Sequence, residues 1–71
     1  MTLKDLLDVL YVGNSLIVEV KNCYGGIELT LNFRDVRYAR EYDGNDDILS
    51  YEVASVEAAG FMKLIICVWK D

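Results

Sequence analysis

The chain has 71 residues, of which 54% are hydrophobic, and it carries a net charge of −5 with no histidine. A chain of this length (residues 1–71) is expected to form one small domain that buries about 60% of its unfolded surface, so it needs dense packing or self-association. Without histidine it lacks the commonest general base and the commonest transition-metal ligand. The acidity argues against direct binding to nucleic acid or to anionic membranes. We therefore expect no catalytic residues, no metal and no cofactor.

Residues 2–11 are predicted to form a short amphipathic helix. Thr2 and Asp5 have the spacing of a capping box, with Asp in place of Glu or Gln. Leucines then recur at helical spacing, at Leu3, Leu6, Leu7 and Leu10. Because so short a helix is unstable alone, its leucine stripe must dock on a sheet.

Four strands are predicted near residues 15–21, 26–33, 50–58 and 61–69. Gly25-Gly26 supplies the turn of the first hairpin, and Ala59-Gly60 is expected to supply that of the second. The apolar run of the third strand begins at Ile48, and its phase shifts near Ala54-Ser55, which indicates a bulge. Residues 34–42 are predicted to be irregular, with one helical turn at most, and 43–47 to be a loop.

These elements predict an α+β fold in which an N-terminal helix packs on a four-stranded, mostly antiparallel sheet. A small SH3-like barrel is the alternative. It would arise if the sheet curled on itself to cover both of its faces.

The last strand is apolar on both sides, whereas a half-buried strand alternates. Leu64, Ile66 and Val68 point one way, and one helix with the other strands can cover them. The residues of the other side need a partner subunit, another protein or a closed barrel. They are predicted to form an oligomer interface, made of Ile17, Ile65, Cys67 and Trp69.

Negative charges gather in the second half of the chain with no Lys or Arg between them. These acids are Glu41, Asp43, Asp46, Asp47, Glu52 and Glu57. They are typical of a solvated loop, or of a negative patch that selects a basic partner. Asp43, Asn45 and Asp47 match the start of an EF-hand loop, but Ile48 and Ala54 stand where its glycine and glutamate are required, so no calcium site is predicted.

Arginines and tyrosines alternate just before these acids. Arg34, Arg37 and Arg40 recur every three residues, interleaved with Tyr38 and Tyr42. Both residue types are enriched at binding hot spots. Intramolecular salt bridges to neighbouring acids are the alternative. The predicted protein-binding residues are Arg37, Tyr38, Arg40, Glu41, Tyr42, Asp43, Asp46 and Asp47.

Cys23 and Cys67 form no C-x-x-C pair, and Cys67 reads as a small buried apolar residue. The first residues carry an acid where a signal peptide would be basic, and no apolar run is as long as a membrane span. We expect a cytoplasmic protein with reduced thiols.

The segments Thr2–Leu7, Val53–Ala58 and Leu64–Val68 resemble short, mostly uncharacterised proteins of Firmicutes prophages and mobile elements. The resemblance covers about half of the chain and implies a phage context with no known activity. The middle of the chain departs from that pattern.

Three hypotheses follow. The first is a non-enzymatic module that binds a host protein, in its most concrete form an inhibitor of a nucleic-acid-binding defence complex of the anti-CRISPR type. The second is a structural homo-oligomer. The third is an enzyme or small-molecule binder, which requires a pocket that the sequence does not indicate.

Overall fold

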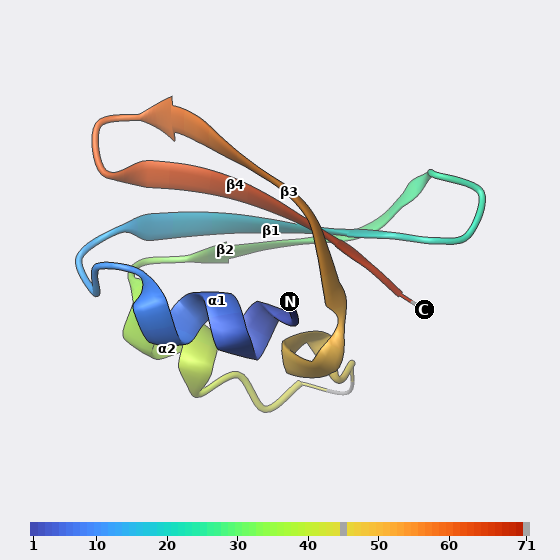
Figure 1. Cartoon of the computed structure of the whole chain (residues 1–71), viewed down its shortest axis with the longest axis horizontal. Coiled ribbons are helices and arrows are strands. Elements are labelled where there is room, and N and C mark those ends of the chain that lie inside the picture. The colour runs from blue at the N-terminus through green and yellow to red at the C-terminus, as the bar shows by residue number, and fades with distance from the viewer. Residues whose placement is uncertain (45, 71) are drawn as a thin grey trace.

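The structure, a computed structural model, describes residues 1–44 and 46–70 and has the predicted α+β fold (Figure 1). Its elements in chain order are α1 (Leu3–Val9), β1 (Ser15–Lys21), β2 (Ile27–Phe33), α2 (Val36–Arg40), the 3-10 helix η1 (Ile48–Ser50), β3 (Glu52–Gly60) and β4 (Lys63–Trp69). The helices lie on one side of the sheet, so the molecule has two layers.

The sheet has the strand order β2-β1-β4-β3. The β1–β2 and β3–β4 hairpins are antiparallel, whereas the central strands β1 and β4 pair in parallel. The sheet is therefore mixed but mostly antiparallel, as predicted. It is open, with β2 and β3 at its edges, so the SH3-like barrel is excluded.

Helix α1 begins with the predicted capping box. The backbone amide of Asp5 donates to Thr2 Oγ1 at 3.2 Å, and the amide of Thr2 donates to Asp5 Oδ2 at the same distance. Leu3 and Leu7 are fully buried against the sheet. The helix ends at Val9, before the predicted boundary at residue 11, because Leu10 takes an extended conformation (φ −78°, ψ 146°).

The first hairpin turns where predicted. Asn22 Oδ1 accepts hydrogen bonds from the amides of Tyr24 and Gly26, and Gly25 takes a positive φ of 82° that favours glycine. The hairpin projects beyond the helical layer (Figure 1).

The second hairpin turns later in the chain than predicted. The turn predicted at Ala59-Gly60 is wrong, because β3 continues to Gly60 and the turn residues are Phe61 and Met62. Met62 takes the left-handed conformation, with φ 55°. The predicted bulge is confirmed by a register shift between Val53 and Ser55.

The third strand was predicted to begin with the apolar run at Ile48, and this start is also wrong. Ile48–Ser50 is a 3-10 turn, and the strand begins at Glu52. The turn places the Ile48 side chain in the core, where its exposure is 0%, and the Ser50 hydroxyl donates to the Asp47 carbonyl at 2.9 Å. The 3-10 turn therefore accompanies burial of Ile48, in a segment that contacts α1.

The core lies between the sheet and the helices. Its fully buried residues come from α1, β1, α2, η1 and β4, and they are Leu3, Leu7, Leu16, Val18, Val20, Val36, Ala39, Ile48, Ile66 and Val68. Alternate residues of β1 and β4 point to the opposite face, over which no element of residues 1–44 and 46–70 lies (Figure 1).

Carboxylates cap both α-helices. Asp35 Oδ1 accepts hydrogen bonds from the amides of Arg37 and Tyr38, which explains the helical turn that the sequence only partly indicated. Partial burial raises the pKa of Asp35, but hydrogen bonds from the Arg37 side chain and from these amides outweigh it, so the pKa lies below 3.8. The hydrogen bonds with Thr2 likewise lower the pKa of Asp5 below 3.8.

Acid is therefore expected to destabilise the fold through these caps. A depressed carboxylate pKa stabilises the folded state above the unfolded pKa, and this contribution disappears as the pH falls through the folded pKa. The urea midpoint should drop between about pH 6 and about pH 2. Asp35→Asn keeps a capping oxygen that does not titrate, so its midpoint should drop less. Equal drops in wild type and variant would show that the Asp35 cap contributes nothing to the pH dependence.

Candidate protein-binding surface

The open face of the sheet carries a stripe of apolar residues from the two central strands. The parallel register places Ile17 beside Ile65, Glu19 beside Cys67, and Lys21 beside Trp69. The structure thus brings together all members of the predicted interface, Ile17, Ile65, Cys67 and Trp69. Trp69 is 40% exposed and Cys67 is 8% exposed. We call these residues the open-face stripe.

Two charged side chains of β1 partly cover this stripe. The Cys67 thiol donates a hydrogen bond to Glu19 Oε1 at 3.4 Å. The Lys21 ammonium lies 5.9 Å from the centroid of the Trp69 ring, within the range of a cation–π contact. The exposed apolar area is therefore narrower than the sequence suggested, because polar neighbours on the same face shield Cys67.

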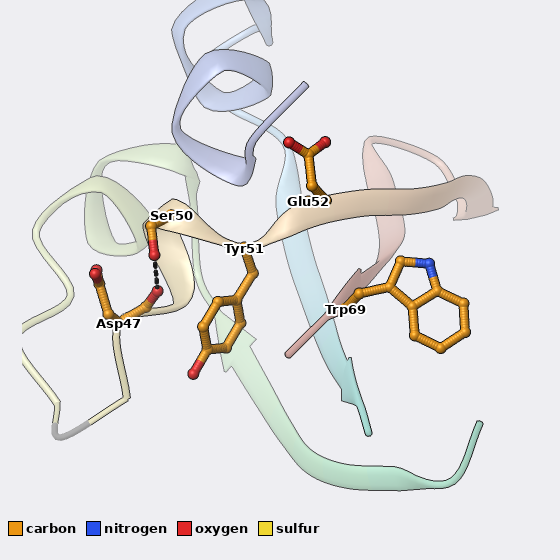
Figure 2. Close-up of a pocket in the computed structure, with 5 residues that line it drawn as sticks. All are labelled: Asp47, Ser50, Tyr51, Glu52 and Trp69. Atoms are coloured by element: carbon orange, nitrogen blue, oxygen red, sulfur yellow. Dashed lines mark hydrogen bonds between the residues drawn. The ribbon is translucent and has the colours of Figure 1, made fainter. Parts of the chain in front are cut away.

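A hollow lies at the Trp69 end of the stripe. It has a volume of about 550 Å³ and is lined by Asp47, Ser50, Tyr51, Glu52 and Trp69 (Figure 2). These residues come from η1 with its flanking residues, from the start of β3 and from the end of β4. Glu52 and Trp69 are direct cross-strand neighbours. The sequence indicated Trp69 and the acids, but not Ser50 and Tyr51, which were assigned to a continuous strand.

The Arg/Tyr segment forms a separate region at α2. Arg37, Tyr38 and Glu41 line a shallow hollow of about 200 Å³. A second hollow, of about 450 Å³, is lined by Asn32, Phe33, Arg34, Tyr38, Glu41, Tyr42 and Asp43. The rings of Phe33 and Tyr42 meet edge to face, 5.9 Å apart, and both pack against the core, so Tyr42 supports the fold as well as this surface.

The arginines of this region differ in their contacts. Arg37 pairs with Asp35 at 3.2 Å and its side chain is 71% exposed. Arg40 Nη2 instead donates to the Leu7 carbonyl at 2.6 Å, and its Nε lies 4.0 Å from Asp8. Arg40 thereby links α2 to the C-terminal end of α1. Arg37 thus pairs with a neighbouring acid, as considered from the sequence, whereas Arg40 faces the distant Asp8.

The acidic residues are distributed over several places. Glu41 and Asp43 line a hollow with Arg34, Asp47 and Glu52 line the hollow that Trp69 also lines, and Glu57 lies across from Ile65 on the open face. Asp46 lies near Lys70, whose pKa is raised first by its hydrogen bond to Glu28 and only weakly by the Asp46 charge. Asn45, part of the predicted loop, lies outside the described residues.

In the described ranges 1–44 and 46–70, no three Cys, Asp or Glu side chains lie close enough together to hold a metal ion. No helix within these ranges is long and apolar enough to cross a membrane.

The fold and this surface define a small α+β protein, in which the helices of residues 1–44 and 46–70 cover one face of a mixed sheet. No family model, no curated protein and no solved structure matches the chain.

Proposed function

We propose that this chain is a non-enzymatic protein-binding module that acts in the cytoplasm and derives from a phage. The observation that carries the proposal is the open face of the sheet, where Trp69 stands 40% exposed at the edge of a hollow of about 550 Å³. Exposed tryptophans beside hollows are typical of binding hot spots, since they bury much area with few rotatable bonds.

The partner we propose is a basic host protein. The net charge of −5 and the two carboxylates that line the hollow favour a positively charged surface and would accelerate association with it. Basic grooves occur in proteins that bind nucleic acid, and an acidic protein competes for them. The most concrete form of the proposal is therefore an inhibitor of a nucleic-acid-binding defence complex of the anti-CRISPR type.

A homo-oligomer is the second candidate, because the open-face stripe is itself a surface that a second copy could cover. In a two-fold dimer the stripe would contact its own equivalent. Glu19, Lys21 and Glu57 lie on the same face and allow cross-subunit pairs of opposite charge.

A pair of variants tests the first candidate. Trp69→Lys adds a positive charge at the hollow, and Tyr24→Lys makes the same charge change at a hairpin-tip residue that is 93% exposed. In a plasmid-interference assay in CRISPR-active Firmicutes cells, wild type and Tyr24→Lys should restore transformation, whereas Trp69→Lys should restore at most about one tenth as much. Circular dichroism checks that both variants fold.

The outcomes separate the candidates. No restoration by wild type removes the anti-CRISPR form, and equal restoration by both variants removes Trp69 from the interface. Light scattering measures the mass of the wild type, and a monomer at high concentration eliminates the homo-oligomer.

A further inference from the structure

Strand β3 lies at one edge of the sheet, and within residues 1–44 and 46–70 no named strand pairs with its outer side (Figure 1). Every residue of the segment 54–60 is exposed, and the segment contains no proline, lysine or arginine. Proline and lysine are residues that keep edge strands from pairing with other chains. This part of the edge is therefore open to an added strand.

The N-terminus already pairs with the start of this edge. Thr2 and Glu52 form an isolated antiparallel bridge, and the Val53 amide donates to the Met1 carbonyl at 2.9 Å. The Met1 ammonium lies 3.0 Å from Glu52 Oε2. The edge of β3 thus accepts an extended antiparallel segment that places a cation beside a glutamate, and this pairing stops at Val53.

The backbone of Val56 and Ala58 faces the open part of the edge. In an antiparallel pair, opposite residues alternate between those that bond to each other and those whose backbone groups point away. The Val53 amide points away from β4, and Val53 lies opposite Val68. Val56 and Ala58 lie opposite the residues two and four positions before Val68 on β4. Their amides and carbonyls therefore point away from β4 as well.

Between these two residues, Glu57 points to the open face of the sheet. It lies opposite Ile65, in the same cross-strand row as Ile17. Its side chain makes no ion pair with any residue of the ranges 1–44 and 46–70. The other edge strand differs, because its Glu28 pairs with Lys70 at 3.0 Å. The β3 edge therefore offers an acid that an incoming cation can pair with.

We propose that the partner protein adds a strand to this edge, antiparallel to β3, over residues 55–58. Its main chain bonds to Val56 and Ala58, and an arginine or lysine pairs with Glu57 on the open face. The residues before and after that cation pack beside Val56, which is 44% exposed, and beside Ala58, so an apolar–basic–apolar pattern fits. In this mode of recognition main-chain bonds supply affinity and alternate side chains supply specificity. The inference rests on the proposed function and names the structural element through which the basic partner binds.

Peptides test this pairing by nuclear magnetic resonance. Isotope-labelled protein is titrated with acetyl-Thr-Ile-Arg-Ile-Thr-amide and with the same peptide carrying glutamate in place of arginine. We expect the arginine peptide to slow hydrogen exchange of the Val56 and Ala58 amides, and the glutamate peptide to bind at least about threefold more weakly. Glu57→Lys should reverse this preference. Glu41→Lys makes the same charge change at the end of α2 and should preserve it.

Backbone methylation separates strand addition from simple charge attraction. In the proposed register both isoleucine amides of the peptide face β3, whereas the arginine amide faces away. Methylating both isoleucine nitrogens removes two main-chain donors and should weaken binding at least about tenfold. Methylating the arginine nitrogen should change binding by less than about threefold.

The contrary outcomes are equally specific. Equal binding of the arginine and glutamate peptides, equal effects of the two methylations, or unchanged exchange at Val56 and Ala58 overturns the edge pairing. A wild-type dimer in which these amides are protected without peptide also overturns it, since a second copy then occupies the edge. If the pairing fails while Trp69→Lys still abolishes restoration of transformation, only this inference is wrong. If the arginine peptide binds as expected but wild type restores no transformation, the pairing stands and the anti-CRISPR function is wrong.

Discussion

Replacing Leu7 with alanine is expected to lower the free energy of unfolding by about 2–5 kcal/mol. Leu7 is fully buried where α1 packs on the sheet, and its removal takes apolar atoms from the core and leaves a cavity. A chain of 71 residues has a total stability of about 4–11 kcal/mol at typical values per residue. The substitution therefore removes a large share of it, which urea unfolding followed by circular dichroism measures.

Val9→Ala is the matched control on the same helix. Val9 is 72% exposed, so its loss should change the free energy of unfolding by less than about 0.5 kcal/mol. Similar losses for the two variants would mean that α1 does not dock through the face that contains Leu7.

Replacing Arg40 with alanine is expected to lower the free energy of unfolding by about 1–3 kcal/mol. The guanidinium satisfies the Leu7 carbonyl at the end of α1, a position where helices lack intrahelical partners, and it also faces Asp8. Its loss removes a charged hydrogen bond between the two α-helices. Thermal unfolding monitored by circular dichroism measures the change.

Arg37→Ala, one helical turn away, serves as the comparison. In the described part of the chain Arg37 pairs locally with Asp35, and its side chain is 71% exposed, so the expected loss is below about 1 kcal/mol. If Arg37→Ala proves as destabilising as Arg40→Ala, the link between α1 and α2 is not what distinguishes the two arginines. Because its side chain is largely exposed, Arg37 is also accessible to a partner protein.

Local patterns predicted most of the fold. The Thr2/Asp5 capping box, the alternation of β2 and the bulge near Ala54 all depend on neighbours in sequence, and all are present. The 3-10 turn at Ile48 was missed because an apolar run that follows a loop looks like the start of a strand. Only the position of the core beneath α1 distinguishes the two.

The surface was predictable only in part. The apolar residues on both sides of β4 identified the face of Ile65, Cys67 and Trp69. They did not indicate the cover from Glu19 and Lys21, which follows from the long-range parallel register. The acids looked like one group because they are close in sequence. The turn at η1 and the direction of β3 separate them in space, and period-based patterns contain no information on the path of a loop.

The parallel pairing of β1 with β4 affects the expected rate of refolding. It joins residues such as Glu19 and Cys67, which are 48 positions apart, whereas each hairpin closes locally. Hairpins form within microseconds but are barely stable alone, and closing the long intervening loop is entropically unfavourable. Pairing of the two hairpins through β1 and β4 should therefore limit the refolding rate. Neither half of the chain should remain folded without the other.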